Sequence, residues 1–130
     1  MKMSSDLFKH LVMYAGNDLP RESCGLLGGN GAEILSVIPL KNEAGTNRQF
    51  YVKEENVQAA FIRLNEIGHD LIAIYHSHPT SNPIPSQADI HFHPDESVKM
   101  AILSLKDKPQ LKIFQIAGGQ YFEIPYIIMD

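Results

Sequence analysis

The sequence feature that most constrains the fold is a short apolar segment that runs directly into two histidines. Leu71 to Tyr75 is almost continuously apolar, which is typical of a strand buried on both faces and is too short for most helices. His76 and His78 follow at once, and side chains two residues apart on a strand project from the same face. The pattern therefore predicts a buried strand that ends by presenting two imidazoles side by side.

The connection after the histidines is predicted to be stiff and extended. Pro79, Pro83 and Pro85 fix three φ angles within seven residues. Ser86 is a residue type that often caps the start of a helix, and Asp89 would be the third helical position, where the helix dipole favours a carboxylate. A rigid segment would thus carry one carboxylate to a fixed place.

His76, His78 and Asp89 together suggest a metal site. Two neutral imidazoles and one carboxylate leave a tetrahedral zinc ion with one open position, as in catalytic zinc sites. Non-haem iron oxygenases use the same types of ligand, so the ligand types alone do not fix the metal. A His-x-His pair by itself is a weak signal, because single histidines beside apolar strands are more often surface or core residues. The interpretation rests on the pair, the prolines and the helix start standing together.

This stretch resembles a known signature. From His76 to Asp89 it reads His-x-His-Pro, six residues, Ser, two residues, Asp, which is similar, without gap or mismatch, to the JAMM signature of the MPN-plus (JAB) metalloproteases. That signature also has an upstream glutamate, and Glu22 in Glu-Ser-Cys-Gly-Leu-Leu-Gly-Gly resembles it. The resemblance covers nearly the whole chain. It implies an MPN/JAB-like fold of the cytidine-deaminase-like type, with a β-sheet core flanked by helices.

The resemblance also implies a role for each residue. His76, His78 and Asp89 would hold zinc, which can lower the pKa of a bound water to roughly 7. Glu22 would be the general base that takes the proton of this water and passes it to the departing amine. On its position alone, Glu22 would be an ordinary surface glutamate after a turn. Ser86 would donate a hydrogen bond to the oxyanion of the tetrahedral intermediate, although its hydroxyl could instead only cap the helix.

Other reactive residue types have simpler explanations. A lone buried cysteine such as Cys24 is commonly just a small apolar residue, so it is a weaker candidate nucleophile than metal-activated water. Ser77 lies between the two histidines and should point to the opposite face in a structural role. His91 and His93 would diverge around a helix that starts at Ser86, which favours solvated histidines and leaves open a contact at the mouth of the site.

Composition excludes several classes of function. A length of 130 residues fits one domain, spanning 1–130. The net charge of −4, without clustered basic residues, argues against a nucleic-acid partner. The single cysteine excludes an intrachain disulfide and fits a reducing compartment. No apolar run is long enough to span a bilayer or serve as a signal sequence, so we expect a cytoplasmic protein with no membrane partner.

Hydrophobic periodicity predicts the remaining elements. Helices are expected over 4–17 and 54–68 with a short one from Ser86, a polar loop over 41–48, and further strands over 22–29, 32–40, 49–52, 98–105, 111–117 and 120–124. The apolar end from Tyr126 to Met129 would either add a last strand or cover a partner, which leaves a homodimer open. The mixture predicts an α+β (mixed α/β) fold with a central, mostly antiparallel β-sheet flanked by helices.

The resemblance further implies a class of substrate. Family members cleave amide or isopeptide bonds after the C-terminal Gly-Gly of ubiquitin or ubiquitin-like proteins, and small stand-alone prokaryotic members process ubiquitin-like sulfur-carrier proteins. The short chain has no room for long insertions, which favours this stand-alone group. A Gly-Gly tail could add to a sheet edge, for which Gln49 to Val52 is the candidate. The alternative function is a non-catalytic MPN-type protein-binding scaffold, which the complete ligand set disfavours.

Overall fold

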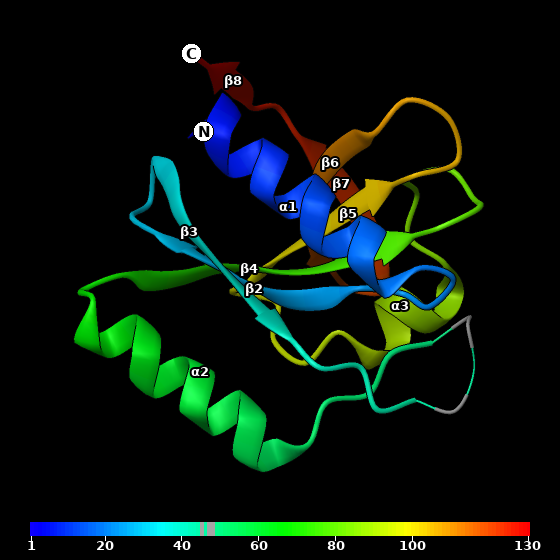
Figure 1. Ribbon diagram of the computed structural model, residues 1–130, viewed down its shortest axis with the longest axis horizontal. Coiled ribbons are helices and arrows are strands. Elements are labelled where there is room, and N and C mark those ends of the chain that lie inside the picture. The colour runs from blue at the N-terminus through cyan, green and yellow to red at the C-terminus, as the bar shows by residue number, and fades with distance from the viewer. Residues whose placement is uncertain (45, 47–48) are drawn as a thin grey trace.

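A single curved β-sheet runs through the molecule, which a computed structural model describes over residues 1–44, 46 and 49–130. Its strands follow the spatial order β7-β6-β5-β4-β2-β3-β1-β8 (Figure 1). In chain order they are β1 (Lys2–Ser4), β2 (Cys24–Gly29), β3 (Glu33–Leu40), β4 (Asp70–His78), β5 (Lys99–Ser104), β6 (Gln110–Ala117), β7 (Gln120–Ile124) and β8 (Ile127–Met129). The helices are α1 (Ser5–Asp18), α2 (Glu54–Glu66) and α3 (Gln87–Phe92). The pairs β2/β3, β2/β4, β5/β6 and β6/β7 are antiparallel, which confirms the predicted fold class.

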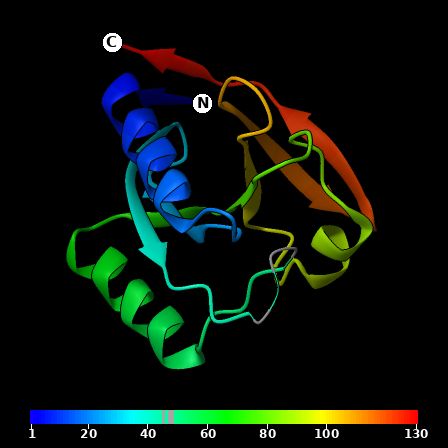
Figure 2. The ribbon, with the colours of Figure 1, turned by 45° about the vertical axis from the view of Figure 1, so that its right-hand side comes forward.

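The helices cover opposite faces of the sheet (Figures 1 and 2). On one face, Leu11 of α1 joins a buried cluster that includes Tyr75 of β4. On the other face, Leu64 of α2 packs with Leu26 of β2. Ile90 of α3 packs against a cluster of β5 and β6 residues on this second face. Side chains of the central strands thus pack into two apolar layers, one on each face of the sheet. The helices α2 and α3 pack against the same layer.

The central strand β4 carries the predicted metal ligands. It pairs with β2 on one side and with β5 on the other, and the β5 register continues to its last residue, His78. The predicted strand over Leu71 to Tyr75 is therefore confirmed, and it extends through both histidines. Backbone hydrogen bonds on both edges hold the strand, so His76 and His78 stand on a rigid support.

Most of the other predicted elements are confirmed. The expected helix over 4–17 is α1, and the hydroxyl of its N-cap Ser4 accepts a hydrogen bond from Leu7 N at 3.1 Å. The expected helix over 54–68 is α2, and Gly68, with φ +73°, follows its end. The strands after the site form β5, β6 and β7. The predicted loop over 41–48 includes Gly45, Asn47 and Arg48, which lie outside the described residues.

The strand predicted over Gln49 to Val52 is wrong, because these residues form an irregular segment. The Asn42 side chain donates to Gln49 O at 3.1 Å and accepts from Tyr51 N at 3.1 Å, and Glu43 N donates to Tyr51 O at 2.6 Å. These backbone groups are therefore occupied within the loop and do not pair with a neighbouring strand. The suggestion that this segment is a sheet edge for a substrate tail loses its basis.

Both termini end in short strands that lie on the same side of the molecule (Figure 2). The apolar C-terminal segment forms β8, which pairs in parallel with β1, so the first of the two predicted alternatives holds. The strand β1 was not predicted, because three residues carry too little periodicity to identify. Among the described residues, the helices are all too short or too polar to cross a bilayer.

Gly25 is required where β2 packs closely against its neighbours. A Cβ atom at this position would collide with the Ile38 carbonyl oxygen and with the Tyr75 ring, both of which are held in the sheet. Gly16 in α1 is the opposite case, because a Cβ atom there would meet nothing within 4 Å.

We therefore predict opposite effects of two glycine substitutions on stability. Gly25→Ala should lower the free energy of unfolding by about 2–3 kcal/mol, because the added methyl group overpacks the sheet. Gly16→Ala should raise it by about 0.5–1 kcal/mol, because alanine favours the helix. Urea unfolding monitored by circular dichroism measures both values, and a Gly25→Ala variant as stable as the wild type would contradict the described packing.

Candidate metal centre

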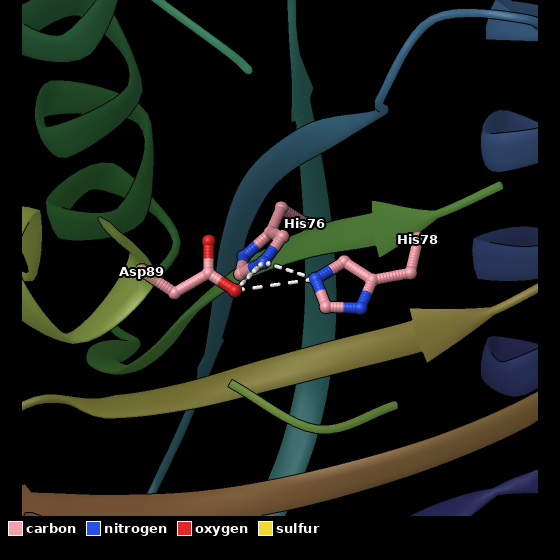
Figure 3. A group of neighbouring side chains, drawn as sticks. All are labelled: His76, His78 and Asp89. Atoms are coloured by element: carbon pink, nitrogen blue, oxygen red, sulfur yellow. Dashed lines mark hydrogen bonds and ion pairs between the residues drawn. The ribbon is translucent and has the colours of Figure 1, made fainter. Parts of the chain in front are cut away.

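The side chains of His76 and His78 point toward one another and toward Asp89, as Figure 3 shows. His76 and His78 are only 2% and 7% exposed, and their Nε2 atoms lie 3.1 Å apart. The Nδ1 atom of His78 lies 2.8 Å from the Asn82 carbonyl oxygen, which fixes Nδ1 as the protonated nitrogen. In the neutral ring the lone pair of His78 is then on Nε2, the atom that faces the centre.

Asp89 reaches the same point through a capping box at the start of α3. Ser86 Oγ accepts from Asp89 N at 3.0 Å, and Asp89 Oδ2 accepts from Ser86 N at 2.9 Å. The same Oδ2 atom lies 3.1 Å from His76 Nε2 and 3.2 Å from His78 Nε2. The predicted position of Asp89 as the third helical residue is therefore confirmed, and the cap aims its carboxylate at the two imidazoles.

The proline segment between the histidines and α3 is pinned to the neighbouring strand. Ser104 at the end of β5 donates its hydroxyl to Ser81 O at 2.7 Å, and Leu105 N donates to His78 O at 3.0 Å. Pro83 and Pro85 are buried. The segment is thus an anchored connection, as the three prolines predicted.

The arrangement fits a divalent metal ion. The three ligand atoms are separated by 3.1–3.2 Å, and three ligands of a tetrahedral ion at about 2.0–2.1 Å are separated by about 3.3 Å. Three atoms that each offer a lone pair repel one another in a buried site unless a proton or a cation lies between them. The described residues contain one such group of His, Cys, Asp or Glu side chains.

The electrostatics of the three residues agree with a cation-binding role. Burial works to raise the pKa of Asp89, but its close contacts with the His76 and His78 rings hold it well below the usual carboxyl range. Burial lowers the pKa of His76, which keeps this ring neutral. Burial also acts to lower the pKa of His78, but its contacts with Asp89 and the Asn82 carbonyl raise it. Asp89 is thus charged and His76 neutral, as a metal ion requires, whereas the raised pKa of His78 means that a metal ion must compete with a proton at this ring.

Glu22 lies at the same end of the sheet as the histidines. Ser77 N donates to Ser23 O at 2.9 Å beyond the last paired residues of β2 and β4, which continues the pairing and brings Glu22 opposite His78. Its side chain is 8% exposed. Burial raises the pKa of Glu22 to about 7, and His78 and Asp89 are close enough to influence it. The structure thus brings all the predicted site residues to one place.

The remaining candidates do not join the metal centre: Cys24, Ser77 and His93 make structural contacts, and His91 is exposed, as expected for a solvated histidine. Burial raises the pKa of the Cys24 thiol to about 12, and its Sγ lies 3.7 Å from Leu40 O, so it is a poor nucleophile. Ser77 accepts from Ser23 N at 2.7 Å on the far face, as predicted. His93 lies 2.7 Å from Val98 O, and His91 is exposed against the Phe92 ring.

The sequence did not indicate that Phe50 covers the site. Its ring stacks on that of His76, with the centroids 5.1 Å apart and the planes inclined by 25°. The two residues are far apart in the chain, and no spacing rule connects a loop residue to a strand that it meets only in the folded state. The burial of His76 depends partly on this ring.

Comparisons with known proteins cover most of the chain. A family model described as prokaryotic homologs of the JAB domain matches residues 4–117. A CysO-cysteine peptidase from Mycobacterium tuberculosis is 28% identical over 97% of this chain and 89% of that protein. A desampylase from Haloferax volcanii is 31% identical over 64% of this chain and 62% of that protein.

Solved structures share the fold. A solution structure from Desulfitobacterium hafniense superposes with a TM-score of 0.91 at 27% identity, covering 99% of this chain and 92% of that one. The crystal structure of a JAB1/MPN domain protein from Archaeoglobus fulgidus gives a TM-score of 0.70 at 21% identity over the full length of both chains. These likenesses confirm the MPN/JAB-like architecture.

The buried carboxyl of Glu22 predicts a pH-dependent stability in the metal-free protein. A carboxyl whose pKa is raised from 4.5 to about 7 by folding contributes full stability below pH 4.5, and this contribution is lost as the pH rises through 7. Glu22→Gln removes the ionisable group, so between pH 4.5 and 8 the wild type should lose about 3 kcal/mol relative to the variant. Chemical unfolding in the presence of a chelator across this range measures the difference. Parallel stability curves would show that Glu22 is not buried as described.

Proposed function

The chain belongs to the family of prokaryotic homologues of the JAB domain, and on that basis we propose that it is a zinc-dependent peptidase of the JAMM type. Its substrate would be a ubiquitin-like or sulfur-carrier protein, joined through its C-terminal Gly-Gly to the group that is released. The relatives support this class, since they include a CysO-cysteine peptidase, a desampylase and a probable TtuB-protein conjugate cleaving protease. The observation that carries the proposal is the convergence of two imidazoles and a carboxylate beside a buried glutamate.

His76, His78 and Asp89 would hold the zinc ion. When bound, zinc supplies a Lewis acid that polarises the scissile carbonyl and lowers the pKa of a water molecule. One carboxylate and two neutral imidazoles neutralise only part of the ion's charge, which suits a catalytic site. The Asn82 carbonyl and the capping box around Asp89 keep the ligands oriented.

Glu22 would move the protons of the reaction. In the proposed reaction it takes a proton from the attacking water and delivers it to the amine that leaves, without binding the metal itself. Its raised pKa, near 7 in the metal-free site, shows that its surroundings disfavour the charged form. A group with a pKa near the working pH can both accept and return a proton.

Ser86 would combine two roles. Its Oγ accepts a hydrogen bond from Asp89 N, and this leaves its own hydroxyl hydrogen free to donate. The side chain is exposed at the start of α3, beside the metal ligands. In the proposed reaction it donates to the developing oxyanion, a contribution of about 3 kcal/mol by analogy with other donors of this kind.

The metal site is tested by binding measurements that need no substrate. Asp89→Asn keeps an oxygen that can accept from Ser86 N but removes the charge, so we expect zinc affinity to fall by at least about 100-fold. Asp95 provides a matched control, because it also accepts hydrogen bonds from a nearby serine, Ser97, and lies outside the site. Competitive titration with a chromophoric chelator measures both variants. Equal zinc affinity of Asp89→Asn and Asp95→Asn would remove Asp89 from the ligand set.

The activity is tested on a panel of carrier proteins whose C-terminal Gly-Gly is joined to cysteine, to lysine or to a peptide. We expect cleavage that a chelator abolishes, and a fall in kcat of about 10²- to 10⁴-fold for Glu22→Gln with zinc still bound. Cys24→Ala is the control for thiol catalysis and should keep its activity. Full turnover by Glu22→Gln would exclude its role as the base. A zinc-loaded wild type that binds the carriers without cleaving any of them would favour the protein-binding scaffold.

A further inference from the structure

Asn42 has a side chain whose hydrogen-bonding capacity is completely used. It follows β3, is 7% exposed, and donates through Nδ2 to Glu22 O at 2.9 Å and to Gln49 O at 3.1 Å. Its Oδ1 accepts from Ala44 N at 2.9 Å and from Tyr51 N at 3.1 Å. An amide offers two donors and two acceptor positions, so all four are filled. One buried side chain thus joins the main chain of Glu22 to both parts of the following loop.

Two of these partners flank the aromatic residue that covers the metal site. Gln49 and Tyr51 are the chain neighbours of Phe50, whose ring stacks on His76 at 5.1 Å. The main chain on either side of Phe50 is therefore held by the same amide group. The Phe50 ring lies against a metal ligand that is only 2% exposed, so the position of this loop bears directly on the surroundings of His76.

We infer that Asn42 is a positioning residue that holds two parts of the metal site in place together. These are Glu22, the proposed base, and Phe50, whose ring lies over His76. Asn42 fixes the main chain of Glu22 through one hydrogen bond and the main chain around Phe50 through two. This inference rests on the proposed function, since it assigns Asn42 to the geometry of that reaction. Within the described residues, the hydrogen bonds of Asn42 reach main-chain atoms and not the Glu22 carboxylate or the Phe50 ring, so it acts through the backbone alone.

The geometry explains why an asparagine is suited to this position. A shorter or apolar side chain would leave the Glu22 and Gln49 carbonyls without their donor in a largely buried place, which destabilises the loop. Aspartate has nearly the same shape but offers no N–H, so it would place acceptors against both carbonyls. The hydrogen bond from Glu43 N to Tyr51 O does not involve the Asn42 side chain, so we expect it to keep the loop attached in either variant.

The test compares Asn42→Ala and Asn42→Asp with a matched control elsewhere in the fold. Asn30 makes the same kind of contact, because its Oδ1 accepts from Ala32 N at 2.9 Å and from Glu33 N at 2.8 Å. It lies in the β2–β3 turn, at the end of β2 that is remote from the metal site. Asn30→Ala should therefore lose hydrogen bonds and some stability without disturbing the site. Asn30 is exposed, so its loss should cost less stability than that of Asn42, but a purely structural role for Asn42 would leave the His76 ring and kcat as unchanged as they are in Asn30→Ala.

The first readouts need neither substrate nor metal. Hydrogen exchange of the Tyr51 amide should accelerate at least about 10-fold in Asn42→Ala and stay unchanged in Asn30→Ala. The His76 ring protons, shifted in the NMR spectrum by the ring current of Phe50, should move toward the position seen in a Phe50→Leu variant. Phe50→Leu also keeps the inference testable if the Asn42 variants fold poorly, because it removes the stacking but keeps an apolar side chain.

The second readout is the kinetics of cleavage, measured well below the melting temperature of each variant. We expect kcat to fall about 10- to 100-fold in both Asn42 variants, with a smaller change in KM and with zinc still bound, and kcat to stay at the wild-type value in Asn30→Ala. Retained wild-type kcat in Asn42→Ala, or an unchanged His76 spectrum in that variant, would overturn the inference. If the wild type cleaves no carrier, the proposed function fails, while hydrogen exchange and the His76 shift still decide whether Asn42 holds the loop.

Discussion

The structure depends on one electrostatic constraint, the close approach of three lone-pair atoms in a place with little water. His76 Nε2, His78 Nε2 and Asp89 Oδ2 lie 3.1–3.2 Å from one another. Such a cluster is unfavourable unless a cation or protons neutralise the repulsion. The fold must therefore hold the three atoms in place against this repulsion, so that the ligands are already arranged when an ion binds.

The fold meets this constraint by placing each ligand on an element that is fixed from more than one side. The two histidines end a strand with neighbours on both edges, and the carboxylate is locked by a reciprocal cap at the start of α3. The connection between them is anchored to β5 through Ser104. On the opposite side, Asn42 links the chain at Glu22 to the loop that carries Phe50. The site is thus enclosed by contacts that come from well-separated parts of the sequence.

The parts that could be predicted from sequence are those governed by local rules. The strand through His78, the cap of Ser86 and Asp89 and the two long helices follow from spacing, residue type and proline geometry. The interpretation of Gln49 to Val52 as a strand was wrong. Backbone groups of Gln49 and Tyr51 form hydrogen bonds with the Asn42 side chain and not with a neighbouring strand. Propensity cannot anticipate this competition, since Asn42 meets the segment only after the loop closes. The stacking of Phe50 on His76 escaped prediction for the same reason, whereas β1 was missed because three residues carry too little periodicity.

The central claim is that His76, His78 and Asp89 bind one zinc ion and leave one position for water. X-ray absorption spectroscopy at the zinc edge tests this most directly, because it reports the number, type and distance of the atoms around the metal in solution. The account predicts four nitrogen or oxygen neighbours at about 2.0–2.1 Å, with the outer-shell scattering of two imidazoles. Scattering from sulfur at about 2.3 Å, which would mean that Cys24 binds the metal, or the absence of imidazole scattering would contradict it.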